Sequence, residues 1–152
     1  PLEALLAGGG QESRRRAGTE NVIAIAGFGA AAAAARRDLE HVARIRDLRD
    51  SLEAELVRTN PDSVFVAKDA PRLPNTTLVA MPGKHSETLV IKLDLAGIAV
   101  SAGAACSSGK VGTSHVLEAM GVAPEIARGA VRVSLGPSST ADEVQRFIAA
   151  WN

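Results

Sequence analysis

The sequence predicts an α/β fold in which a sheet of short strands is covered by helices. Residues 21–60 have the apolar spacing of helices, and the remainder alternates short strand-like segments with short helices. With 152 residues, 46% of them hydrophobic and 22% charged, the composition is that of a globular domain large enough to bury a core.

The predicted helical region at residues 21–60 has two parts. Residues 22–37 are dense in alanine, with small Gly27 and Gly29, which suits a helix packed closely against another element. Apolar residues then recur every three or four positions: Leu39, Val42, Ile45, Leu48, Leu52 and Leu56. We expect one long amphipathic helix or two in succession, ended by the turn signal at residues 60–62.

Short segments follow this turn signal. We expect strands at residues 63–66, 76–81, 98–100 and 130–135, and helices beginning near residues 86, 114, 124 and 140. Gly97 is the expected C-terminal cap of the first of these helices. The result is three or four short strands among helices.

Composition and charge exclude several classes of function. The 17 basic and 17 acidic residues cancel, so neither a nucleic acid nor an anionic membrane is an expected partner. The most apolar stretch, residues 22–35, is too short and weakly hydrophobic to span a bilayer. A single cysteine cannot form an internal disulfide, which agrees with a cytoplasmic location. The sequence contains no zinc-type motif, and His41 is expected to be solvated. We therefore assign no metal.

Cys106 is the candidate nucleophile. It is the only cysteine and lies within residues 101–109, a run of small residues that offers little apolar burial. Free cysteines are often small buried hydrophobes, but here the neighbours favour an exposed loop thiol. His115 is nine positions away, and we expect it to be a helix N-terminal residue and not a base for the thiol.

Residues 8–19 combine the parts of an anion site. Gly8, Gly9 and Gly10 leave backbone N–H groups uncovered, residues 14–16 are arginines, and Thr19 offers a hydroxyl. These groups all donate hydrogen bonds to a phosphate or carboxylate. The alternative is a solvated basic turn in which Thr19 is the N-cap of the following helix.

Arg132 is the candidate anion clamp. It lies in the strand at residues 130–135, and we expect its side chain to point inward. A buried guanidinium needs an anionic partner. That partner is a substrate carboxylate or, alternatively, an internal Asp or Glu.

Four motifs, in this order along the chain, resemble those of a known enzyme family: residues 8–21, 101–109, 114–121 and 131–136. Together they resemble the cysteine desulfurases, pyridoxal-phosphate (PLP) enzymes of the class V aminotransferase group, and most closely their nitrogen-fixation and iron–sulfur-cluster branch. The resemblance implies the C-terminal part of a fold-type I PLP-dependent transferase. Residues 1–37 would be the tail end of the large PLP-binding domain. Residues 38–152 would be the small α/β domain, with the cysteine loop at 101–113.

The resemblance also implies an activity: conversion of L-cysteine to L-alanine, with the sulfur held as a persulfide for iron–sulfur cluster or other sulfur-cofactor assembly. By likeness, Cys106 is the nucleophile and persulfide carrier, and Arg132 binds the substrate carboxylate. Thr19 would donate to the cofactor phosphate of the neighbouring subunit in a homodimer. A sulfur-acceptor or iron–sulfur scaffold protein is the implied partner.

The family's Schiff-base lysine is not recognisable in this chain. It lies in a His-Lys segment upstream of the Gly-rich motif, and none of Lys68, Lys84, Lys92 and Lys110 has that context. The chain also opens on Pro1 without an initiator Met. We therefore expect the last third of an enzyme, inactive alone. Two alternatives remain open: a non-catalytic sulfur-relay or partner-binding module, and a PLP enzyme of the selenocysteine lyase type.

Overall fold

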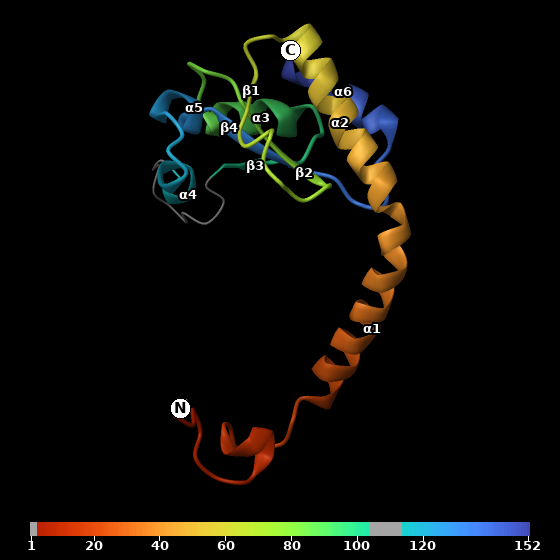
Figure 1. The fold of residues 1–152 in the computed structure, drawn as a ribbon, viewed down its shortest axis with the longest axis vertical. Helices are drawn as coiled ribbons and strands as arrows, with labels where there is room; N and C mark the ends of the chain where they lie inside the picture. The colour runs from red at the N-terminus through yellow and green to blue at the C-terminus, as the bar shows by residue number, and fades with distance from the viewer. Residues whose placement is uncertain (1–2, 104–113) are drawn as a thin grey trace. The chain divides into compact units, whose positions relative to one another are not determined.

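The computed structural model describes residues 3–103 and 114–152. The chain divides into two compact units, Pro1–Leu39 and Glu40–Asn152, which we describe separately. The predicted α/β class is confirmed: helices accompany one small antiparallel sheet (Figure 1). None of the helices in the described residues has both the length and the apolarity needed to cross a membrane.

The first unit consists of a turn and a helix. A parallel bridge joins Leu6 to Arg16 and closes the segment that contains the short 3-10 helix η1 (Gln11–Arg14). The helix α1 (Val22–Asp38) begins at Asn21, whose side chain accepts a hydrogen bond from the Ala24 N–H at 3.0 Å. The interpretation of Thr19 as the N-cap is therefore wrong, because Asn21 has that role.

Two successive helices occupy the region for which one or two were predicted. After α1 comes the 3-10 turn η2 (Leu39–His41), and α2 (Val42–Thr59) follows it directly. In α2, Ile45, Leu52 and Leu56 are buried, as their spacing predicts. The helix ends one residue before Asn60, at the predicted stop.

The sheet has four strands in the order β1-β2-β4-β3, and every neighbouring pair is antiparallel. The strands are β1 (Val64–Phe65), β2 (Thr76–Ala80), β3 (Ser101–Ala102) and β4 (Ala130–Ser134). The strand predicted at residues 98–100 is wrong, because pairing to β4 begins only at Ser101. The apolar triplet at 98–100 instead packs beside the core, where Ile98 and Val100 are partly buried.

The described part of the second unit contains four further helices: α3 (Ser86–Leu95), α4 (His115–Ala119), α5 (Pro124–Arg128) and α6 (Ala141–Trp151). Specific residues define the termini of α3 and α6. The C-cap of α3 is Ala96, and Gly97, predicted as the cap, is the next residue and adopts the left-handed conformation with φ +73°. Thr140 and Glu143 form a capping box at the start of α6.

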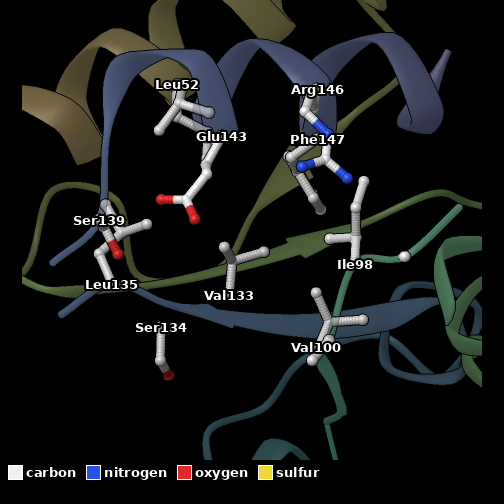
Figure 2. A pocket seen from close by; sticks show the side chains of 13 residues that line it. Leu52, Ile98, Val100, Val133, Ser134, Leu135, Ser139, Glu143, Arg146 and Phe147 are labelled. Carbon is white, nitrogen blue, oxygen red and sulfur yellow. The ribbon is translucent and has the colours of Figure 1, made fainter.

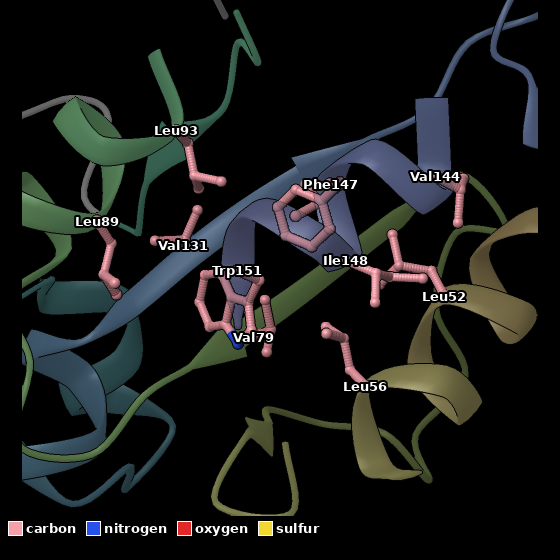
Figure 3. Close-up of a cluster of buried hydrophobic side chains, with 11 residues drawn as sticks. Leu52, Leu56, Val79, Leu89, Leu93, Val131, Val144, Phe147, Ile148 and Trp151 are labelled. Carbon is pink, nitrogen blue, oxygen red and sulfur yellow. The ribbon is translucent and has the colours of Figure 1, made fainter. Parts of the chain in front are cut away.

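The two faces of the sheet have different surroundings. Val79 and Val131 point to one face and join the main core with residues of α2, α3 and α6 (Figure 3). Val133 belongs to the same core cluster. A smaller cluster forms where Ala80 and Ala130 meet α4 and α5. Because side chains alternate along a strand, residues between the buried valines of β4 lie on this second face.

Trp151 is the largest fully buried side chain of the described core. Its indole Nε1 donates to Ser63 Oγ at 2.9 Å, and its ring centroid lies 5.6 Å from that of Phe147. Trp151→Phe is expected to lower the free energy of unfolding by about 1–3 kcal/mol, through lost volume and a lost buried hydrogen bond. Urea denaturation of the chain measures this. Ile91→Val, at a residue that is 61% exposed on α3, is the control, and an equal loss there would contradict the prediction.

Candidate functional site

Arg132 lies in the middle of β4, between buried Val131 and Val133. The expectation that its side chain points inward is wrong: the two valines face the main core, and Arg132 is exposed on the other face. Because side chains alternate along a strand, the burial of these two valines places Arg132 on the opposite, exposed face. An exposed guanidinium needs no internal counter-ion and is accessible to a ligand.

The strand register fixes the neighbours of Arg132. Leu78 of β2 lies opposite it on one side, and Ser101 of β3 lies opposite it on the other. Its Nη2 donates a long hydrogen bond of 3.4 Å to Ser101 Oγ. Side chains that face each other across an antiparallel pair lie on the same face of the sheet. The second face therefore presents a cation flanked by a hydroxyl and an apolar side chain.

Within residues 3–103 and 114–152, Arg132 forms no ion pair with an Asp or Glu. The internal carboxylate considered as its partner is thus not seen in the described structure. A guanidinium has five N–H donors in a planar fork, and the Ser101 hydroxyl accepts from one of them. The remaining donors suit the two oxygens of a carboxylate.

Thr19 lies in the first unit, in an exposed position after the Gly-rich turn. Arg16 organises this turn: its Nη1 donates to the backbone oxygen of Gly18 at 2.9 Å and to that of Thr19 at 3.3 Å. Arg14 and Arg15 are exposed. The donor set of hydroxyl and guanidinium groups fits a phosphate, which is the anionic end of PLP.

Cys106, the sequence-predicted nucleophile, lies outside the described residues, as does the rest of residues 104–113. The described chain that precedes it is well anchored, because the Gly103 N–H donates to the Ala130 oxygen at 2.8 Å. After the gap, buried Ser114 caps α4. His115 is exposed as the first residue of that helix, where it was predicted.

A separate cavity of about 190 Å³ lies on the core side of β4 (Figure 2). Val100, Val133 and Leu135 contribute to its apolar wall, and Arg146 lies at its edge. Glu143 also lines it, but this carboxylate already accepts a hydrogen bond from the Thr140 N–H at 2.9 Å. Arg132 does not line this cavity, so the candidate site is distinct from it.

A buried ion pair beside α2 was not foreseen from the sequence. Arg72 donates to both carboxylate oxygens of Glu53, at 2.6 and 2.7 Å, and the Glu53 side chain is only 4% exposed. Burial would raise the pKa of Glu53, but hydrogen bonds from Arg72 and Thr77 and the charges of Arg72 and Arg49 outweigh it and lower that pKa. These charges are satisfied within the fold, and we assign them a structural role.

The described residues contain no cluster of His, Cys, Asp or Glu that could hold a metal ion. They do present two groups that suit anions: exposed Arg132 with Ser101 on the second face of the sheet, and the donors around Thr19. The sequence indicated Arg132 and Thr19 by residue type and motif. It placed Ser101 in the motif at 101–109, but it gave no signal that Ser101 lies beside Arg132, because these two residues become neighbours only through strand pairing.

The model of one protein family, aminotransferase class V, matches residues 7–147, and the chain belongs to this family. The cysteine desulfurase of Cereibacter sphaeroides is 43% identical over 97% of this chain, and the cysteine desulfurase NifS of Azotobacter vinelandii is 41% identical over 95%. The crystal structure of a NifS-like protein from Rickettsia africae superposes with a TM-score of 0.83 at 38% identity, covering 99% of this chain. The resemblance to cysteine desulfurases is confirmed.

The chain spans only about two fifths of these proteins: 38% of the C. sphaeroides relative, 36% of the A. vinelandii relative and 39% of the R. africae chain. This coverage agrees with the prediction that the chain corresponds to one part of such an enzyme.

Proposed function

We propose that this chain is the C-terminal part of a cysteine desulfurase, which converts L-cysteine to L-alanine and keeps the sulfur as a persulfide on Cys106. The observation that carries the proposal is the exposed Arg132, which has no acidic partner in the described structure. The strand paired to it, β3, ends at Ala102, four residues before Cys106 in the sequence. The strand that pairs with the carboxylate clamp is thus joined to the thiol by one short stretch of chain.

The sulfur transfer balances without a further reactant. The Cys106 thiolate attacks the sulfur of L-cysteine, a sulfur–sulfur bond forms, and the bond between that sulfur and the substrate's β-carbon breaks. The electron pair of the broken bond stays on the substrate carbon, which takes up a proton and leaves as L-alanine. The enzyme thiol becomes a persulfide, which passes its outer sulfur to an acceptor protein for iron–sulfur cluster or other cofactor assembly.

PLP, when bound, supplies the electron sink that makes such a bond cleavage accessible. Within this chain, Thr19 would donate to its phosphate, by likeness in the neighbouring subunit of a homodimer. Arg132 would orient the substrate through its carboxylate. We expect the complete protein to act in the cytoplasm, and this chain to be inactive alone, because no lysine in it has the context of the Schiff-base residue.

The decisive experiment incubates the complete protein, with PLP, in L-cysteine and a reductant, and measures alanine and sulfide. Equal amounts of alanine and sulfide are the expected result. Alanine formed from L-selenocysteine but not from L-cysteine would favour the selenocysteine lyase alternative. Absence of both activities would favour the sulfur-relay module, and either outcome would overturn the proposal.

Arg132→Lys in the complete protein is expected to raise the KM for L-cysteine by about tenfold or more, because lysine keeps the charge but loses the planar fork. Initial rates of alanine formation over a range of L-cysteine concentrations measure this. The matched control is Arg128→Lys, at the last residue of α5. An unchanged KM for Arg132→Lys would show that Arg132 does not bind the substrate carboxylate.

A further inference from the structure

Ser101 has a relation to Arg132 that the sequence motif does not explain. The two residues are register partners across β3 and β4, and the Ser101 hydroxyl accepts a hydrogen bond from Arg132 Nη2. We propose that Ser101 is a positioning residue that orients the guanidinium of Arg132 toward the carboxylate of the amino-acid substrate. This inference rests on the proposed function, in which Arg132 binds that carboxylate.

Among the described residues, Ser101 is the one whose side chain restrains the guanidinium of Arg132. Leu78, the register partner on the other side, has no side-chain acceptor, and the hydrogen bond to Ser101 Oγ is the one that the Arg132 guanidinium makes among the described residues. The side chain of an exposed arginine has several rotatable bonds, and restricting their rotation when a ligand binds costs free energy. A contact that restricts these rotations before the substrate arrives lowers that cost.

The chemistry of the anchor also suits this role. A hydroxyl is a neutral acceptor, so it restrains the guanidinium without cancelling its charge. A carboxylate in the same position would compete directly with the substrate for the arginine. Ser101 occupies one Nη2 hydrogen and leaves the other N–H groups of the fork for the two substrate oxygens.

The test uses the complete protein with Ser101→Ala, Ser101→Thr and a matched control, Ser134→Ala. Ser134 is an exposed serine on the same face of β4, opposite Thr76, and among the described residues it makes no hydrogen bond to Arg132. Removing a hydrogen bond worth about 1 kcal/mol predicts a three- to tenfold higher KM for L-cysteine in Ser101→Ala, with kcat within about twofold. Ser101→Thr keeps the hydroxyl and is expected to restore the KM.

A binding measurement provides a readout separate from turnover. The probe is 3-mercaptopropionate, which carries the thiol and carboxylate of cysteine but no amino group. Its Kd, measured by calorimetry, is expected to rise by the same factor in Ser101→Ala and to stay unchanged in Ser134→Ala.

The outcomes separate this inference from the proposed function. If the wild-type protein produces alanine from L-cysteine but Ser101→Ala has an unchanged KM and Kd, the positioning role alone is overturned. The role is also overturned if Ser134→Ala has the same effect as Ser101→Ala, since the loss would then reflect the strand and not the hydrogen bond. A wild-type protein without activity on L-cysteine overturns both.

Discussion

Cys106→Ala in the complete protein is expected to reduce sulfide formation from L-cysteine by about 10³-fold or more, because the variant has no thiol to accept the substrate sulfur. The same variant is expected to show no persulfide after incubation with L-cysteine and alkylation. Mass spectrometry of the peptide that contains Cys106 measures this, since a persulfide adds one sulfur atom to the alkylated wild-type peptide. Binding of L-cysteine is expected to remain, because Arg132 is unchanged.

The matched control is Ser107→Ala, which changes the adjacent residue and leaves the thiol in place. It is expected to retain most of the activity. Full sulfide formation by Cys106→Ala would contradict the sulfur-carrier role and favour a lyase in which the loop thiol is dispensable.

Arg72→Met is expected to lower the free energy of unfolding by about 3–5 kcal/mol, because it leaves the buried Glu53 carboxylate without its bidentate partner. The loss is expected to be largest near neutral pH. The lowered pKa of Glu53 means that its ionised form stabilises the fold above the carboxylate's ordinary pKa of about 4.3. That stabilisation is lost as the pH falls through the lowered pKa, so the difference between wild type and variant shrinks in acid. Urea denaturation at several pH values measures it.

Two controls test the burial argument. Arg58 pairs with Glu55 at the surface, at 2.5 Å, so Arg58→Met is expected to leave the unfolding transition unchanged. The double variant Glu53→Leu with Arg72→Met removes both charges, and it is expected to be more stable than Arg72→Met alone. An Arg72→Met protein as stable as wild type at neutral pH would show that the Glu53 charge is solvated in the folded state.

Local signals in the sequence predicted most of the secondary structure because they act over a few residues. The capping box at Thr140, the left-handed Gly97 and the stop at Asn60 all lie where the residue types indicated. The strand predicted at 98–100 failed because a short apolar triplet fits either a strand or a segment packed beside the core. Sheet pairing decided between these alternatives.

Gly129 shows how a local interpretation can be correct and incomplete. The sequence indicates a glycine that ends α5, and the structure confirms it as the C-cap. In addition, a Cβ at this position would lie 2.3 Å from the Met81 carbonyl oxygen. The close approach arises because the end of β2 passes beside the start of β4. No pattern around residue 129 contains that information.

The sequence by itself determined the fold class and the resemblance to cysteine desulfurases, and it indicated Cys106 as the candidate nucleophile, because motifs and apolar spacing are local properties. Only the tertiary structure decided which face of β4 presents Arg132, that Ser101 is its partner and that Glu53 and Arg72 neutralise each other. The physical reason is that these contacts join residues 19 and 31 positions apart. Strand register and helix packing bring such residues together, and both depend on the whole core.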